Sequence, residues 1–177
     1  RREGRQASLL GISAVDGDGK NIFEVGDTST KTHMRSTAKP FQVIPLLSSG
    51  LPPHLSLSDL ALFMSSHGGE PMHTERVAEI LHLFGLSKID LCCGAHAPQN
   101  LKAQFELMKK QEMPSSLHNN CSGKHAAMLI LCQLLGESAY LELDTKIQEK
   151  IKAAISLFCG INEIEMDSGI DGCSMPS

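Results

Sequence analysis

The sequence predicts an α+β fold, in which a short antiparallel hairpin near the N-terminus is followed by a series of helices. Residues 8–15 and 20–25 contain β-branched residues and flank an Asp-Gly-Asp-Gly turn, a pattern typical of a β-hairpin. Further along, apolar residues recur at helical spacing, most clearly at Val77, Ile80, Leu81 and Phe84. Because no repeat or linker divides the 177 residues, we expect a single domain over residues 1–177.

Proline, glycine and capping residues set the expected bounds of the helices. Pro40 is tolerated only in the first turn of a helix, so the first helix must begin near Ser36 and end before Gly50. A short helix over residues 56–64 is expected, with Ser56 or Ser58 as its N-cap. The remaining elements are an irregular segment over 65–71, helices over 77–84, 98–111, 124–135 and 147–158, a loop over 118–123, and a short buried strand over Ile89–Cys93.

Two features suggest a fold larger than this chain. Residues 169–177 read as a loop with no closing element after them. An isolated hairpin is only marginally stable and needs further strands. We therefore expect the chain to be the N-terminal part of a larger domain, truncated at its C-terminus.

Composition excludes several classes of function. The 16 Lys and Arg against 20 Asp and Glu give a net charge of −4, with no basic run that would bind nucleic acid. No apolar stretch approaches the roughly 18 residues that span a membrane. The N-terminal Arg-Arg-Glu-Gly-Arg lacks the apolar segment of a secretory signal, so we expect a cytoplasmic protein. The six cysteines are irregularly spaced, which favours reduced thiols, some of them metal-bound.

The first chemical motif is the Ser-x-x-Lys step formed by Ser36 and Lys39. A serine hydroxyl needs a base to take its proton, and a desolvated lysine can be that base. At the start of a helix the hydroxyl also has access to backbone N–H donors. The competing explanation is structural, with Ser36 as a helix cap and Lys39 as a solvated surface residue.

Two further clusters combine groups that could act together. In Ser66-His67-Gly68-Gly69-Glu70, a serine, an imidazole and glycines can form an oxyanion pocket or bind a polar substrate, or can be a turn that places Glu70 at a helix N-terminus. Cys121-Ser122-Gly123-Lys124-His125 offers a thiolate, an amine and an imidazole, and Cys173 beside Asp171 could complete a zinc site. The alternatives are buried free cysteines, or Cys121 as a nucleophile with His125 one turn on.

Four segments taken in order resemble the bacterial L-asparaginase II family, the Rhizobium-type thermolabile asparaginases. They are Arg35-Ser36-Thr37-Ala38-Lys39-Pro40-Phe41-Gln42, Ser66-His67-Gly68-Gly69-Glu70, Asn119-Asn120-Cys121-Ser122-Gly123-Lys124-His125 and Asp171-Gly172-Cys173-Ser174. The resemblance runs from about Asp16 to the end of the chain. Residues 5–13 depart from the family pattern, because they lack its His-Arg-Gly step.

The resemblance implies a fold similar to serine β-lactamases and penicillin-binding proteins, with an antiparallel sheet flanked by helices. It implies hydrolysis of L-asparagine to L-aspartate and ammonia. Ser36 with Lys39 would form one Ser-Lys tandem and Ser66 would belong to a second, whose lysine lies beyond Ser177. The remaining implied roles are zinc ligation by Cys121, Lys124 and Cys173, and substrate binding by His67, Gly68, Glu70, His125 and Asp171.

The sequence therefore predicts a Ser-Lys amidohydrolase with L-asparagine as its small-molecule substrate and zinc as a possible structural or positioning ion. We expect it to be a homodimer that binds neither nucleic acid nor membrane. The rival enzymes are a penicillin-recognising acylase and a glutaminase. The rival from another class is a non-catalytic, zinc-stabilised binding or regulatory protein that retains the pocket.

Overall fold

In a computed structural model, residues 11–170 are described and form a mixture of helices with a small two-stranded antiparallel sheet. This content is compatible with the α+β class predicted from the sequence. The wider β-lactamase-like sheet stays a prediction. Contacts divide the chain into two compact units, Arg1–His33 and Met34–Ser177. Each unit is described by itself.

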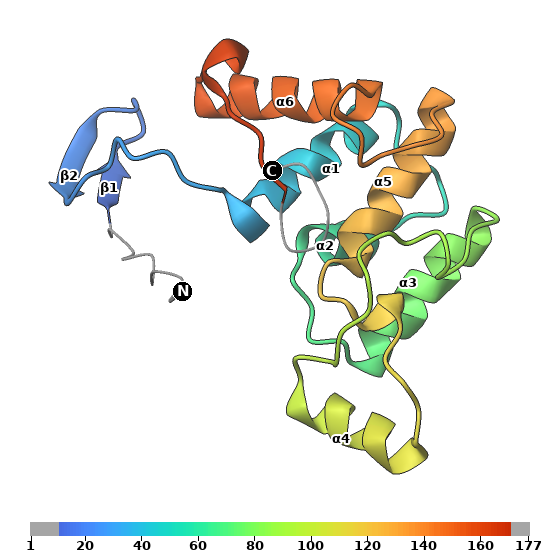
Figure 1. The fold of residues 1–177 in the computed structure, drawn as a ribbon. Helices are drawn as coiled ribbons and strands as arrows, with labels where there is room; N and C mark the ends of the chain where they lie inside the picture. Colours follow the sequence, from blue (N-terminus) through green and yellow to red (C-terminus); the bar gives the residue numbers. More distant parts are fainter. Residues whose placement is uncertain (1–10, 171–177) are drawn as a thin grey trace, which may run out of the picture. The chain divides into compact units, whose positions relative to one another are not determined.

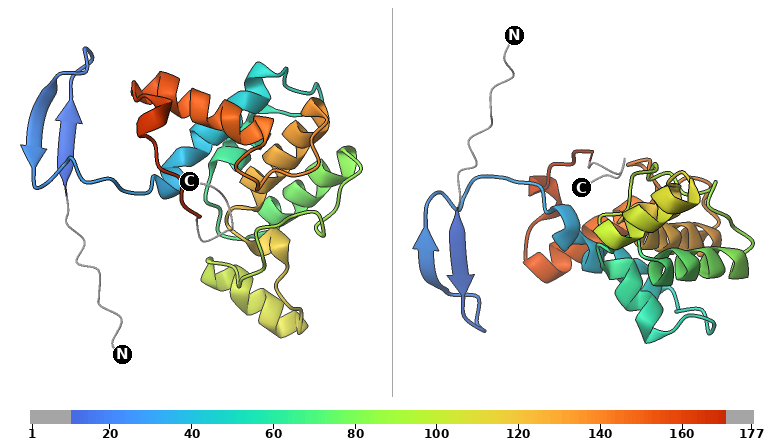
Figure 2. Two further views of the ribbon diagram at one scale, coloured as in Figure 1. Left: turned by 45° about the horizontal axis from the view of Figure 1, so that its top comes forward. Right: turned by 90° about the horizontal axis from the view of Figure 1, so that it is seen from below.

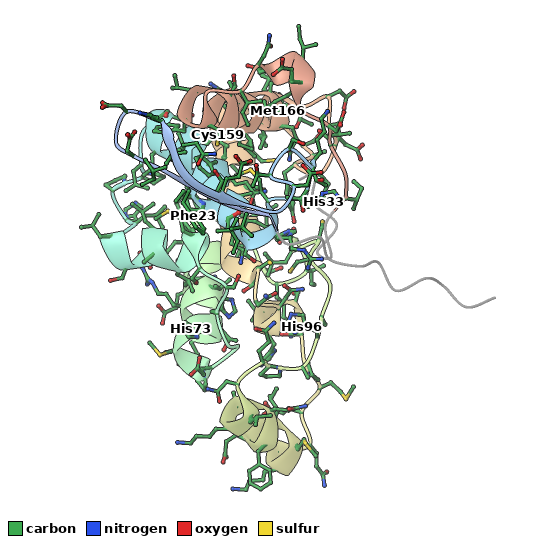
Figure 3. The ribbon with its side chains drawn as sticks, turned by 90° about the vertical axis from the view of Figure 1, so that its left-hand side faces the viewer. Phe23, His33, His73, His96, Cys159 and Met166 are labelled. Carbon is green, nitrogen blue, oxygen red and sulfur yellow. The ribbon has the colours of Figure 1, made fainter. Side chains whose placement is uncertain are left out.

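The first unit contains the predicted hairpin. Strands β1 (Ile12–Val15) and β2 (Asn21–Val25) pair antiparallel, and the Asp16 carboxylate closes the turn by accepting the backbone N–H groups of Asp18 and Lys20. Because side chains alternate along a strand, the pairs Ile12–Val25 and Ala14–Phe23 share one apolar face. Phe23, labelled in Figure 3, is 54% exposed. The other face also carries the apolar residues Val15 and Ile22, and the large apolar side chains of both faces are exposed.

The second unit is helical. Its α-helices are α1 (Lys39–Ser48), α2 (Leu57–Met64), α3 (Pro71–Leu83), α4 (Leu101–Lys110), α5 (Ser122–Leu135) and α6 (Lys146–Cys159), and its 3₁₀ turns are η1 (Arg35–Ala38), η2 (Ser116–His118) and η3 (Glu163–Glu165). Among the described residues, no helix is both long and apolar enough to cross a membrane.

Helix α5 lies at the centre of this unit and contacts α1, α2, α3 and α6 (Figures 1 and 2). Its sequence explains this position, because Ala126, Ala127, Met128, Ile130 and Leu131 make it apolar around its circumference rather than along one stripe. All five side chains are buried. Helix α4 lies apart from this core in Figure 1 and buries only Ala103.

Most of the predicted helices are confirmed with changes at their ends. The largest change is at α3, which begins at Pro71 rather than at residue 77, so Pro71 belongs to this helix and not to the irregular segment. Ser56 caps α2 in a complete capping box with Asp59, as the sequence indicated. Helix α5 begins at Ser122, two residues before the predicted start. The helix predicted from Ser36 is instead a 3₁₀ turn over Arg35–Ala38, followed by an α-helix that begins at Lys39.

The predicted buried strand over Ile89–Cys93 is wrong. This segment consists of turns, and Ile89 is 87% exposed. The reason is local, because the Asp90 carboxylate accepts the backbone N–H and the hydroxyl of Ser87 and folds the chain back on itself. A side chain that bonds the backbone in this way competes with strand formation.

Candidate active site

The starts of α1 and α5 and the end of α2 converge on the Lys39 side chain. Lys39 is the first residue of α1 and is only 1% exposed. Ser65 ends α2 as its C-cap, and Asn120 immediately precedes the Cys121 cap of α5. Three segments that are distant in sequence therefore surround one buried amine.

The Lys39 amine makes three hydrogen bonds at this junction. Nζ lies 2.6 Å from the Ser65 carbonyl oxygen, 3.3 Å from the Asn120 carbonyl oxygen and 2.8 Å from the Ser66 hydroxyl oxygen. The Ser65 carbonyl belongs to the C-terminal end of α2, where the helix dipole favours a positive charge. The explanation of Lys39 as a solvated surface residue is therefore wrong.

Ser66 stands between Lys39 and Ser36. The hydroxyl oxygens of Ser66 and Ser36 lie 3.0 Å apart, so the two serines and the lysine form a continuous hydrogen-bonded chain. Both serines are exposed, whereas the amine behind them is buried. The hydroxyl groups of Ser36 and Ser66 thus face solvent, and the Lys39 amine, a potential base, is buried next to Ser66.

A strained backbone precedes Ser36. Arg35 has a φ of 51°, in the left-handed region that residues other than glycine rarely adopt. The main chain of Ser36 then continues in the 3₁₀ turn, and Ser36 makes no side-chain cap to α1, whose N-cap is Ala38. The helix-cap explanation of Ser36 is therefore wrong. A left-handed residue costs of order 1–3 kcal/mol, and such strain clusters at functional sites.

His67 is a buried neutral imidazole that joins this loop to α5. Its Nδ1 accepts the backbone N–H of Gly69 at 3.2 Å, so the ring proton lies on Nε2, which donates to the Ser122 hydroxyl at 2.8 Å. That hydroxyl in turn donates to the Leu117 carbonyl at 3.0 Å. Burial, followed by the electrostatic effects of His73 and Lys39, lowers the pKa of His67 to about 4.

The two glycines after His67 are required by close packing. Gly69 has a φ of 78°, and a Cβ atom there would lie 3.0 Å from Pro98. A Cβ atom on Gly68 would lie 2.8 Å from a carboxylate oxygen of Glu70. Glu70 is the N-cap residue of α3, and Pro71 follows it at the first helical position. The prediction that Glu70 lies at a helix N-terminus is confirmed.

The Cys121–His125 motif forms the buried first turn of α5. Cys121 and Lys124 are 8% and 2% exposed, and their spacing of three residues places both on one side of the helix. His125 is fully buried, and its Nδ1 forms a hydrogen bond with the Tyr140 hydroxyl over 2.9 Å. Gly123 is structural, because a Cβ atom there would lie 2.6 Å from the Leu62 carbonyl oxygen of α2.

The predicted zinc ligands are only partly within the described residues. Cys173, and also the predicted substrate residue Asp171, lie outside them. Within residues 11–170, no group of three or more His, Cys, Asp or Glu side chains is arranged to hold a metal ion. Cys121 and Lys124 bring two of the three predicted donors to one helical turn.

Sequence reasoning missed two contributors to the site. Asn120 acts through its backbone carbonyl, which accepts from both Lys39 and the His67 N–H, and a backbone group leaves no signal in side-chain patterns. Cys93, which had no assigned role in the site, is buried with 5% exposure. Burial raises the pKa of the Cys93 thiol to about 12, and the charges of Cys121 and Lys124 also act on it.

Comparison with known proteins agrees with these features. A search of curated proteins found no match. The sequence profile of the L-asparaginase II family matches residues 6–177, which is nearly the whole chain and includes all four motifs. The chain belongs to the L-asparaginase II family.

Proposed function

We propose that this protein hydrolyses L-asparagine to L-aspartate and ammonia, with Ser66 as nucleophile and Lys39 as general base. Membership of the L-asparaginase II family suggests an amidohydrolase that acts on asparagine. The observation that carries the mechanism is the chain from Lys39 through Ser66 to Ser36, with separations of 2.8 Å and 3.0 Å. Contacts of this length are within the reach required for proton transfer.

The surroundings of Lys39 suit a base directed at Ser66. The Ser65 and Asn120 carbonyls can only accept hydrogen bonds, so an uncharged amine donates its two N–H groups to them. Nζ also donates to the Ser66 hydroxyl in the structure, so loss of one ammonium proton would leave a lone pair that can accept the Ser66 proton at this contact. The dipole of α2 favours the charged form of the amine and burial opposes it, and we propose that burial dominates and leaves the uncharged form that a general base requires.

The reaction then follows two half-steps. Lys39 takes the Ser66 proton as the serine oxygen attacks the side-chain amide carbon of asparagine. The Lys39 ammonium returns that proton to the amide nitrogen, the C–N bond breaks, and ammonia leaves an aspartyl ester on Ser66. Lys39 then deprotonates water, the hydroxide attacks the ester carbon, and Lys39 returns the proton to the Ser66 oxygen as the ester bond breaks and aspartate leaves. Ser36 orients the Ser66 hydroxyl throughout.

The neighbouring polar groups supply the proposed substrate contacts. The Glu70 carboxylate would accept the α-ammonium group of asparagine, while Gly68 leaves room beside it. His67, neutral at pH 7, would hold the loop to α5 without adding charge. His125 and Asp171 complete the proposed set.

Zinc is proposed as a bound ion with Cys121, Lys124 and Cys173 as ligands. A thiolate and an amine on one buried turn fit a metal that takes sulfur and nitrogen donors. Bound there, zinc would stabilise the start of α5 and supply a fixed positive charge. Metal analysis of protein purified without chelator tests this assignment, and Cys121→Ser should lower both the zinc content and the melting temperature.

The function is tested by ammonia release from L-asparagine, with L-glutamine and a β-lactam as comparison substrates. Ser66→Ala should lower kcat at least ~1000-fold, as loss of a serine nucleophile does. Ser36→Ala leaves Lys39 and Ser66 in contact and should cost roughly 100-fold. Peptide mass spectrometry of protein quenched during turnover should find the aspartyl ester on Ser66. An ester on Ser36 would refute the assignment of the nucleophile, and near-normal turnover in both variants would refute the mechanism.

A further inference from the structure

Asn100 connects the glycine-rich loop to α4 through three hydrogen bonds. Its side-chain oxygen accepts the Ala103 N–H at 3.1 Å and thereby caps α4. Its side-chain nitrogen donates to a carboxylate oxygen of Glu70 at 2.9 Å. Its backbone N–H donates to the Gly68 carbonyl at 2.9 Å. Because the cap fixes the oxygen, the amide nitrogen must face Glu70.

The Glu70 carboxylate is held from two sides. Asn100 donates to one carboxylate oxygen, and Nδ1 of His73 lies 3.1 Å from the other oxygen without forming a hydrogen bond to it. Figure 3 labels His73 on α3. A Cβ atom on Gly68 would meet both the Glu70 carboxylate and the Asn100 side chain, at 2.8 Å and 3.1 Å. The orientation of Glu70 is therefore determined by its neighbours rather than by solvent.

A cavity lies directly beside this pair. Its volume is about 340 Å³, within the range of small-molecule pockets. It is bounded by the start of α3, by α4 and by His118, and Glu70 and Asn100 both line it. The carboxylate is 35% exposed, so it is ordered and also accessible to a ligand.

We infer that Asn100 is a positioning residue that orients the Glu70 carboxylate toward the α-ammonium group of the substrate. This inference rests on the proposed asparaginase function and extends it to a residue outside the four sequence motifs. A carboxylate held by a neutral donor keeps its negative charge for the substrate, and its fixed position avoids an ordering cost on binding. Asn100 thus has a role beyond helix capping.

Two substitutions separate positioning from capping. Asn100→Ser and Asn100→Asp both retain an oxygen that caps α4, so both should melt near the wild-type temperature. Asn100→Ser removes the donor to Glu70 and should raise KM for asparagine several-fold, with a smaller change in kcat. Asn100→Asp places a second carboxylate against Glu70, so KM should rise at least ~10-fold. The acidic limb of the kcat/KM profile should also move to higher pH, because like charges disfavour ionisation.

Asn162→Asp is the matched control, since Asn162 caps η3 through the Ile164 N–H and should leave KM unchanged. Glu70→Gln removes the charge without touching α4 and should share the KM increase. Suppose that the wild-type protein is active on asparagine. A normal KM in both Asn100 variants, or in Glu70→Gln, would then overturn this inference and leave the proposed function standing. Wild-type protein that releases no ammonia from asparagine would overturn the proposed function and this inference with it.

Discussion

The Lys39 amine lies 2.8 Å from the Ser66 hydroxyl, although the two residues are 27 positions apart in the chain. Ser36, the serine of the Ser-x-x-Lys step, is joined to this pair by its 3.0 Å contact with Ser66. Ser66, from a different segment of the chain, therefore lies between Ser36 and Lys39 and links the two residues of the Ser-x-x-Lys step. This arrangement explains why the first two sequence motifs belong to one site.

Lys39→Met tests the contribution of the buried amine. The substitution preserves much of the side-chain volume but removes the proposed base, so kcat for asparagine should fall at least ~100-fold. It also deprives the Ser65 and Asn120 carbonyls of their Lys39 donor, which should cost about 1–3 kcal/mol of unfolding free energy. Turnover and urea denaturation measure the two effects. Lys150→Met, at an exposed position of α6, should change neither, and retained activity in Lys39→Met would contradict the role of base.

The lowered pKa of His67 should make stability depend on pH. The unfolded histidine binds a proton below about pH 6.5, whereas the folded residue stays neutral down to about pH 4. Its contribution is therefore complete above pH 6.5 and is lost as the pH falls toward 4. The loss is on the order of 3 kcal/mol. Urea denaturation across pH 7 to 4 measures it.

His67→Gln removes this titrating group and should flatten the decline in stability between pH 6.5 and 4. The stability of this variant should still fall somewhat as the pH is lowered, because burial lowers the pKa of His118 as well. An equal pH dependence in His67→Gln and wild type would show that His67 is not the neutral buried link to Ser122.

Gly123 should be a packing requirement rather than a catalytic one. Gly123→Ala brings a methyl group within 2.6 Å of the Leu62 carbonyl oxygen, so α5 must move away from α2. Overpacking of this kind typically costs 1–3 kcal/mol. Gly17→Ala is the control, because that position has nothing within 4 Å and no left-handed φ. Equal melting temperatures for Gly123→Ala and wild type would refute the tight α2–α5 contact.

The sequence predicted the helices well because their ends carry side-chain signals. The Ser56 cap of α2 and the end of α5 at Leu135 are boundaries that the structure retains. Pro71 was placed in the irregular segment over 65–71, although it is the first residue of α3. The prediction of a strand over Ile89–Cys93 was wrong because an apolar run this short shows neither a helical nor a strand period. The Asp90 side chain instead stabilises a turn there.

The site was predictable in its residue types but not in its connections. Ser36, Lys39 and Ser66 were all candidates, yet only the fold shows that Ser66 contacts Lys39. Asn120 and Asn100 act through a backbone carbonyl and a cap, so neither forms a chemical motif. The left-handed backbone of Arg35 likewise has no signal, because arginine does not mark that conformation as glycine would.

Asp59 should support the site by fixing α2, the helix that ends just before Ser65 and Ser66. Its carboxylate is 1% exposed, caps the helix through Ser56 and accepts two hydrogen bonds from Arg76, at 2.6 Å and 2.8 Å. The hydrogen bonds from Arg76 lower the pKa of Asp59 to about 2. Asp59→Asn should therefore cost about 2–3 kcal/mol at pH 7, with a difference from wild type that narrows as the pH falls from 4 to 2.

Glu79→Gln provides the comparison, because Glu79 accepts from the same Arg76 but is 63% exposed. An exposed pair contributes little, so this variant should lie within about 0.5 kcal/mol of wild type in the same urea denaturation experiment. Comparing the two variants shows how much burial adds to the stabilisation, because each substitution removes one carboxylate partner of Arg76. Equal effects of the two substitutions would mean that Asp59 acts as an ordinary surface ion pair, and α2 would then need another anchor to hold Ser66 against Lys39.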